Sequence, residues 1–98
     1  MDKQAILDRL RQNESALRER RVIHAALFGS IARGEQNAES DIDILVDLDP
    51  AMVVSIFDYA GVKRYVSSLF PGSVDVLDRE ALKPRIAPTA TADAIDAF

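Results

Sequence analysis

One pair of linked segments constrains this chain more than any other feature. The first is Gly-Ser-Ile-Ala-Arg-Gly-Glu at positions 29–35, and the second is Ser-Asp-Ile-Asp-Ile-Leu-Val at positions 40–46. The run 22–28 precedes them and predicts a short buried strand, because it is apolar and ends at a Gly-Ser turn. The pattern therefore predicts a strand, a tight turn and a second strand in close succession.

The Gly-Ser turn has the composition of a small anion-binding cradle. Gly29 lets the backbone approach a ligand closely, and the residues after it suit a short helix. The free N–H groups of a first helical turn point toward a phosphate, Ser30 adds a hydroxyl donor, and Arg33 is a possible charge clamp. Ser40 fits two roles equally: a phosphate contact, or a residue that satisfies loop backbone groups before the next strand.

Asp41 and Asp43 lie two residues apart in a run whose other members predict a strand. Side chains at positions i and i+2 leave a strand on the same face, so both carboxylates point one way. Two neighbouring anions on a buried strand repel each other and cost desolvation free energy unless something compensates. A divalent cation is the natural compensation, and carboxylate oxygens suit Mg²⁺ or Mn²⁺. A phosphate cradle beside a carboxylate metal site predicts phosphoryl or nucleotidyl transfer.

These linked segments resemble the signature of the nucleotidyltransferase superfamily related to DNA polymerase β. The Ala-Arg-Gly-Glu segment and the short length point to its smallest branch, the minimal nucleotidyltransferases, and the resemblance extends from about Leu17 to Pro84. It implies an α/β (α+β) fold with a small mixed sheet backed by helices, which the length predicts to be a single domain over residues 1–98. It also implies an enzyme that uses Mg²⁺, with two ions possible, and ATP as substrate.

The resemblance implies that three aspartates hold the metal, Asp41 and Asp43 on one strand and Asp75 on a neighbouring one. Asp75 stands between valines in the run 73–77, which predicts a third strand. A solvent-exposed sheet face is the alternative explanation for this residue. By the resemblance, Asp75 could also orient or deprotonate an attacking hydroxyl. The implied phosphate-binding residues are Gly29, Ser30 and, as a weaker candidate, Arg33.

The implied function is transfer of AMP from ATP to a hydroxyl group. Minimal nucleotidyltransferases of this type are typically paired with small helical HEPN-domain toxins, so the resemblance implies an antitoxin that modifies a tyrosine of such a toxin. Two alternatives stay open: a catalytically silent antitoxin that masks its partner, and a nucleotidyltransferase acting on a small molecule or an RNA end. The clustered carboxylates argue against the first, and the missing acceptor domain argues against the second.

Composition limits the setting of this chemistry. The 98-residue chain has no cysteine, which excludes a disulfide framework and a thiolate metal site. Its net charge of −4 argues against broad electrostatic binding to nucleic acid. No apolar run approaches the roughly 20 residues needed to cross a bilayer, and the first residues lack a signal-peptide pattern. We therefore expect no membrane association and a cytoplasmic location.

The N-terminal part predicts two helices before the first strand. Asp2 can cap the first helix, and Asn13 can interrupt it and cap a second helix over positions 14–20. The residues predicted to face inward are Ile6, Leu7, Leu10 and Leu17. A dense basic cluster follows, made of Arg18, Arg20 and Arg21. We interpret it as a solvated helix end, with a docking patch for an acidic partner or nucleotide as the alternative.

The second half predicts one long helix and an irregular tail. Positions 51–69 form the longest helical pattern, with Ile56 and Phe57 on its apolar face. Gly61 weakens this helix by up to about 1 kcal/mol relative to alanine, a cost that close packing on the sheet would explain. Residues 91–98 predict a short helix, and the tail suits a packing flap or a partner-binding segment.

Two other polar residues on the predicted strands could also be considered for functional roles. His24 is the single histidine, and we expect it to be a partly buried structural residue of the first strand. Asp47 lies about 13 Å along the strand from Asp43, at ~3.3 Å per residue, which is too far to share one ion. We therefore expect Asp47 to face solvent or to cap the next helix.

Overall fold

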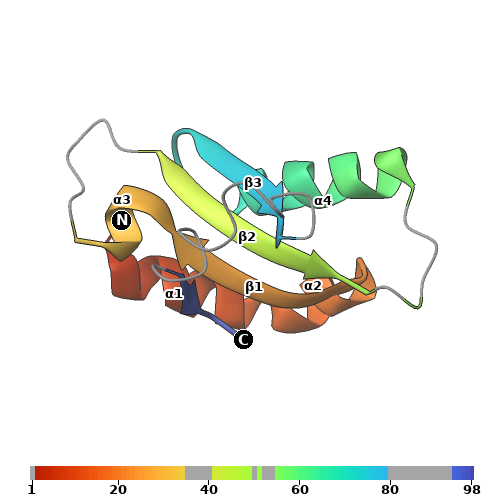
Figure 1. The fold of residues 1–98 in the computed structure, drawn as a ribbon, viewed down its shortest axis with the longest axis horizontal. Coiled ribbons are helices and arrows are strands. Elements are labelled where there is room, and N and C mark those ends of the chain that lie inside the picture. Colours follow the sequence, from red (N-terminus) through yellow and green to blue (C-terminus); the bar gives the residue numbers. More distant parts are fainter. Residues whose placement is uncertain (1, 35–40, 50, 52–54, 80–93) are drawn as a thin grey trace.

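The computed structural model describes residues 2–34, 41–49, 51, 55–79 and 94–98. Within these residues, four strands form one mixed sheet in the order β3-β2-β1-β4 (Figure 1). The strands are β1 (Val22–Phe28), β2 (Ile42–Leu48), β3 (Val74–Asp78) and β4 (Ile95–Asp96). β1 runs antiparallel to both β2 and β4, whereas β2 runs parallel to β3. The predicted mixed sheet is confirmed.

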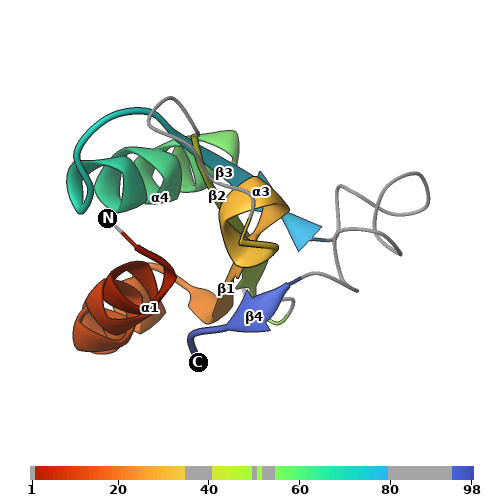
Figure 2. The same ribbon diagram turned by 90° about the vertical axis from the view of Figure 1, so that its left-hand side faces the viewer.

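Helices pack mainly on one face of this sheet. They are α1 (Lys3–Gln12), α2 (Glu14–Glu19), α3 (Gly29–Ala32) and α4 (Ile56–Ser68). Figure 2 shows α1 and α4 on the same side of the sheet, with α3 at the end of β1. Asp2 starts α1 as predicted, because its carboxylate accepts a hydrogen bond from the backbone N–H of Ala5 at 2.8 Å. Across the described residues, no helix combines the length and the apolar character needed to span a membrane.

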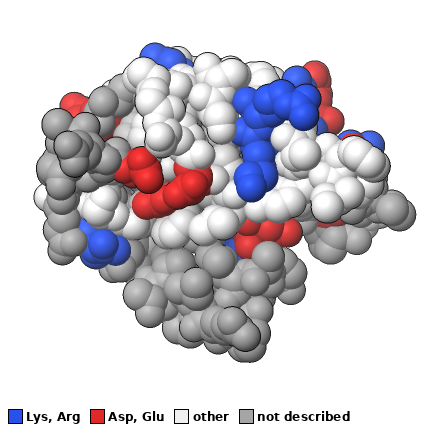
Figure 3. Space-filling view, turned by 90° about the horizontal axis from the view of Figure 1, so that it is seen from above, with Lys and Arg blue, Asp and Glu red and all other residues white. Residues whose placement is uncertain are grey.

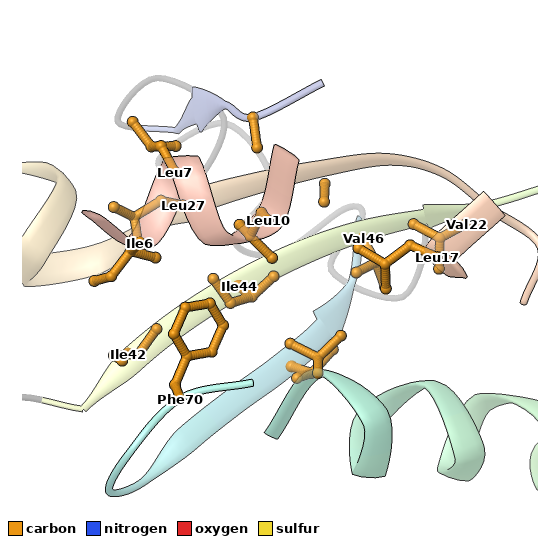
Figure 4. Packing of buried hydrophobic residues seen from close by; sticks show 14 of the residues in the cluster. Ile6, Leu7, Leu10, Leu17, Val22, Leu27, Ile42, Ile44, Val46 and Phe70 are labelled. Carbon is orange, nitrogen blue, oxygen red and sulfur yellow. The ribbon is translucent and has the colours of Figure 1, made fainter. Parts of the chain in front are cut away.

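The main hydrophobic core fills the space between the helices and the sheet (Figure 4). Ile6 and Leu10 of α1 are fully buried against Ile44 and Val46 of β2 in this cluster. Leu17 of α2 is also fully buried, as its spacing predicts. Removing each of these side chains from water contributes roughly 1.5–3 kcal/mol, so this layer fixes the face of the sheet that the helices cover.

The opposite face of the sheet carries a smaller apolar cluster. Ala26 and Leu45 are buried there, with partly buried Leu77 packed against them. Because side chains alternate along a strand, Asp43 of β2 and Asp75 of β3 share the face of Leu45 and Leu77. The predicted functional carboxylates therefore lie on the face opposite α1 and α4.

The predicted apolar face of the long helix is wrong at its start. Ile56 and Phe57 are 78% and 83% exposed, whereas Val62 and Val66 are the buried residues of α4. A capping box formed by Ser55 starts the helix, so positions 56 and 57 lie in its first turn. At 100° per residue, the side chains of Ile56 and Phe57 point away from the stripe formed by Val62 and Val66 further along the helix.

The predicted helix at the end of the chain is also wrong where the structure describes it. β4 pairs with the free edge of β1, and the N–H of Ala97 donates to the carbonyl of Ala25 at 2.8 Å. Nε of Arg11 donates to the carbonyl of Ala97, also at 2.8 Å. The backbone groups of this edge need partners, and satisfying them outweighs the helix propensity of an alanine-rich tail. Residues 80–93 lie outside the described residues.

Candidate active site

The turn after β1 is built around Gly29. Its φ of +79° lies in the left-handed region, which L-residues with a side chain rarely adopt. A Cβ at this position would overlap Oδ2 of Asp43 and would lie 3.1 Å from its Cγ. The space that a side chain would fill is therefore the space of the Asp43 carboxylate. Within the chain, the group that approaches the Gly29 backbone closely is the side chain of Asp43, a candidate metal ligand.

α3 begins directly at this turn, with Phe28 as its N-cap residue. The side chain of Phe28 forms no capping hydrogen bond, so this N-cap residue leaves the first N–H groups of the helix uncapped. Ser30 lies in this first turn, half-buried, next to Gly29. Arg33 follows the helix as its C-cap residue and is exposed. This arrangement suits an anion, as the sequence predicts, and Ser40 lies outside the described residues.

Asp43 and Asp75 are direct register partners on the parallel strands β2 and β3. Burial raises the pKa of the Asp43 carboxyl above its usual value, and the negative charges of Asp75 and Asp41 raise that pKa further. The nearby charge of Arg33 acts in the opposite direction and lowers it. The other two predicted site aspartates and the predicted arginine clamp are thus within electrostatic reach of Asp43. A space-filling view shows acidic and basic side chains in several separate groups on this face of the molecule (Figure 3).

The three carboxylates repel one another without closing on a shared point. In the part of the chain that the structure describes, no three His, Cys, Asp or Glu residues are grouped tightly enough to hold one metal ion. Carboxylates can repel one another at distances too long for them to bind the same ion. The raised pKa of Asp43 is therefore compatible with the lack of a tight group of three carboxylates among the described residues. The donor set is entirely carboxylate oxygen, which suits Mg²⁺, and a cation would offset the repulsion that raises the pKa of Asp43. The residues fit the ion chemically, and their role as ligands stays a prediction.

Tyr59 of α4 holds β3 in place, a role that the sequence did not indicate. Its hydroxyl donates to the carbonyl of Val76 and accepts from the N–H of Asp78, each at 3.1 Å. Burial raises the pKa of this phenol above its usual value. Both bonded residues follow Asp75 on the strand, so the helix behind the sheet helps to hold the strand that carries a candidate site residue.

Two polar residues of the sheet lie apart from the aspartate group. Oδ2 of Asp47 lies 3.4 Å from Nε of Arg79, an ion pair rather than the predicted solvent exposure or helix cap. The same arginine reaches Asp96 of β4 at 3.8 Å and so bridges the far end of the sheet. His24 is exposed, so the prediction of a partly buried histidine is wrong. It follows a register irregularity in β1, which no local sequence signal marks.

Known proteins are similar to this chain in sequence and in fold. A sequence model described as a nucleotidyltransferase domain matches residues 5–96. A candidate protein adenylyltransferase of Methanocaldococcus jannaschii is 36% identical over 74 residues, which are 74% of this chain and 74% of that protein. The protein adenylyltransferase MntA of Thermococcus cleftensis is 33% identical over 87 residues, covering 88% of this chain and 86% of that protein.

Solved structures show the same arrangement of strands and helices. One, of a candidate minimal nucleotidyltransferase, has a TM-score of 0.78 and 28% identity, covering 97% of this chain and 95% of that chain. A toxin–antitoxin crystal structure with AMP-PNP has a TM-score of 0.72 and 20% identity, covering 94% of this chain and 72% of that chain. At this lower identity the second likeness shows the fold alone.

Proposed function

The chain belongs to the nucleotidyltransferase domain family and is a nucleotidyltransferase, and from that premise we propose that it transfers AMP from ATP to a hydroxyl group of a partner protein. Relatives named as protein adenylyltransferases support a protein acceptor. The fold shared with a toxin–antitoxin structure that contains an ATP analogue supports a toxin partner. In its finer form, the proposal is an antitoxin that modifies a tyrosine of a HEPN-domain toxin in the cytoplasm.

The observation that carries this proposal is the placement of Asp43 between Gly29 and Asp75. Asp43 pairs across the sheet with Phe28, the last residue of β1, and with Asp75 of β3. Its carboxylate therefore lies beside the turn that begins at Gly29, on the same face of the sheet as Asp75. A purely structural sheet gains nothing from setting carboxylates side by side, because their mutual repulsion raises the pKa of Asp43 and opposes folding.

Each residue of the site then has a defined task. Asp41 and Asp43 would hold Mg²⁺, which when bound neutralises phosphate charge and favours ionisation of a hydroxyl. The backbone at Gly29 and Ser30 would orient the terminal phosphates through N–H donors. Asp75 would orient the acceptor hydroxyl and take its proton. The hydroxyl oxygen forms a bond to the α-phosphorus, the bond from that phosphorus to the bridging oxygen breaks, and pyrophosphate leaves.

Incubation with labelled ATP, Mg²⁺ and the protein encoded by the neighbouring gene tests the proposal. We expect label from the α-phosphate, but not from the γ-phosphate, to appear on the acceptor, with a mass increase of one AMP group on a tyrosine. The Asp75→Asn variant serves as the inactive control. Growth protection by the wild-type chain with no mass change on the acceptor would contradict the enzymatic proposal and would support a masking antitoxin.

A further inference from the structure

A groove of about 460 Å³ lies between the end of α2 and the outer face of α4. Its lining includes Phe57, Gly61 and Arg64, at spacings that place them on one face of α4, and none of its lining residues belongs to the candidate active site. Phe57 is 83% exposed, although exposure of so large an apolar side chain loses the free energy that burial would provide. Ile56 beside it is 78% exposed, so the apolar surface extends past the groove.

Gly61 is unexplained by packing within the chain. A Cβ at this position would meet no atom within 4 Å, so the expectation that it allows close packing on the sheet is wrong. Its φ is not among the positive values, and alanine would be compatible with the helix at this point. Glycine inside a helix is less favourable than alanine, because it loses more conformational freedom on folding. The open space above Gly61 is available to another molecule.

The rim of this groove is basic, although the whole chain carries a net charge of −4. Arg20, Arg21 and Arg64 line the groove, against two acidic residues. One of these acids, Asp58, is already engaged, because its carboxylate accepts hydrogen bonds from the N–H and the hydroxyl of Ser55 and lies 3.5 Å from Nη1 of Arg21. Arg21 is partly engaged in this ion pair and its Nε is buried, whereas Arg20 and Arg64 are exposed. The groove therefore presents guanidinium donors that suit carboxylates.

We propose that this groove docks an acidic amphipathic helix of the acceptor protein, an inference that rests on the proposed function. Phe57 would insert between apolar residues of that helix, as exposed aromatic anchors do at protein interfaces. Gly61 would let the helix approach α4 closely, and the arginines would pair with its glutamates and aspartates. A second copy of this chain fits less well, because a two-fold contact through this groove would set arginines against arginines.

Steady-state kinetics with the acceptor protein tests this surface separately from the chemistry. We expect Phe57→Ser and Arg64→Glu to raise the KM for the acceptor at least tenfold while kcat at saturating acceptor changes less than twofold. The matched control is Lys63→Glu, which makes a similar charge change on the neighbouring position of α4 outside the groove lining. Binding of AMP-PNP with Mg²⁺ should stay unchanged in all three variants.

Gly61 variants distinguish docking from folding. Gly61→Ala should raise the urea midpoint of unfolding, because no atom of the described residues occupies the space of its Cβ. Gly61→Gln should raise the KM for the acceptor at least tenfold without lowering that midpoint. A loss of stability in Gly61→Ala would show that the glycine serves the fold, and it would overturn the docking role of this residue.

A direct binding measurement keeps the proposal testable when no AMP transfer occurs. The probe is a fluorescein-labelled helical peptide with a leucine stripe flanked by glutamates, and the control peptide carries lysines in their place. Wild-type protein should bind the glutamate peptide at least tenfold more tightly than Phe57→Ser does. Equal binding of both peptides, or an unchanged acceptor KM in Phe57→Ser and Arg64→Glu, overturns the docking surface. Absence of AMP transfer by the wild-type chain, with peptide binding as expected, overturns only the proposed function.

Discussion

Asp43 and Asp75 face each other across two parallel strands, and the absent side chain of Gly29 leaves the space in which the Asp43 carboxylate lies. This three-residue relationship connects the turn proposed to bind phosphate with the aspartate pair. A change at any of these three residues should therefore affect the backbone of the turn, the charge around Asp43 and the proposed chemistry. The following predictions separate these contributions.

Asp43→Asn should raise the free energy of unfolding at pH 7 in metal-free buffer. Burial and neighbouring carboxylates raise the folded-state pKa of Asp43, so the protonated form is favoured in the fold. The stability from this proton is fully present below the usual pKa of 3.8 and is lost as pH rises through the raised folded pKa. Urea unfolding across pH should show a gain in the variant near neutrality that vanishes in acid. An equal gain at every pH would contradict the electrostatic cause.

Gly29→Ala should destabilise the protein more than Gly34→Ala does. Both glycines have positive φ, at +79° and +77°, so alanine costs about 1–2 kcal/mol at each position through the backbone. Only at position 29 would the new Cβ also strike Asp43, since nothing lies within 4 Å of a Cβ at position 34. Urea unfolding measures the difference. Adding Asp43→Ala to Gly29→Ala should recover much of it, and strict additivity in this double-mutant cycle would disprove the clash.

Asp75→Asn should lower AMP transfer by about 10²–10⁴-fold, the usual effect of losing general-base assistance. The variant should still co-purify with the acceptor, because the proposed docking surface lies elsewhere. Partner mass and growth protection measured in the same strains check both statements. Full transfer by Asp75→Asn would remove this residue from the proposed mechanism.

Tyr59→Phe should lower the free energy of unfolding by about 1–3 kcal/mol, because the N–H of Asp78 loses its hydrogen-bond partner. Tyr65→Phe is the matched control, since among the described residues its hydroxyl donates to a side chain, that of Asn13, at 3.0 Å. The control should cost less, because an amide side chain can turn toward water whereas a strand backbone cannot. Thermal and urea unfolding of both variants provide the comparison.

Gly61→Ala should stabilise the protein by about 0.5–1 kcal/mol, the ordinary difference between glycine and alanine in a helix interior. The position is open in this structure, so the added methyl group meets no neighbour within 4 Å. Urea unfolding should show a higher midpoint with an unchanged slope. A lower midpoint would mean that α4 needs the glycine for its own packing.

The elements that carry the candidate site residues could be predicted from sequence because their signals are local. Gly29 and Asp43 lie in two short segments whose turn and strand patterns each have a direct physical meaning. The strand bounds 22–28 agree with β1, and Asp75 lies on a neighbouring strand as the resemblance implies. The role of Gly29 toward Asp43 could not be predicted, because it depends on how two strands meet in space.

Two structural predictions are wrong, and in each case the cause lies outside the local sequence pattern behind the prediction. The tail 94–98 has the composition of a helix, but the free edge of β1 makes it a strand through backbone pairing. Ile56 and Phe57 are apolar, yet the helix start at Ser55 turns them away from the core. The first outcome depends on a strand far along the chain, and the second depends on the residue at which the helix begins; apolar periodicity alone gives neither.

The attachment of β4 has a consequence for the order in which the protein folds. The hydrogen bond from Arg11 to the carbonyl of Ala97 joins positions 86 residues apart, so closing it confines almost the whole chain. Contacts of this sequence separation form late, after the more local β1–β2 pair, and open first under native conditions. In hydrogen–deuterium exchange, we expect the amide of Ala97 to exchange through partial opening while amides in the middle of β2 exchange only with global unfolding.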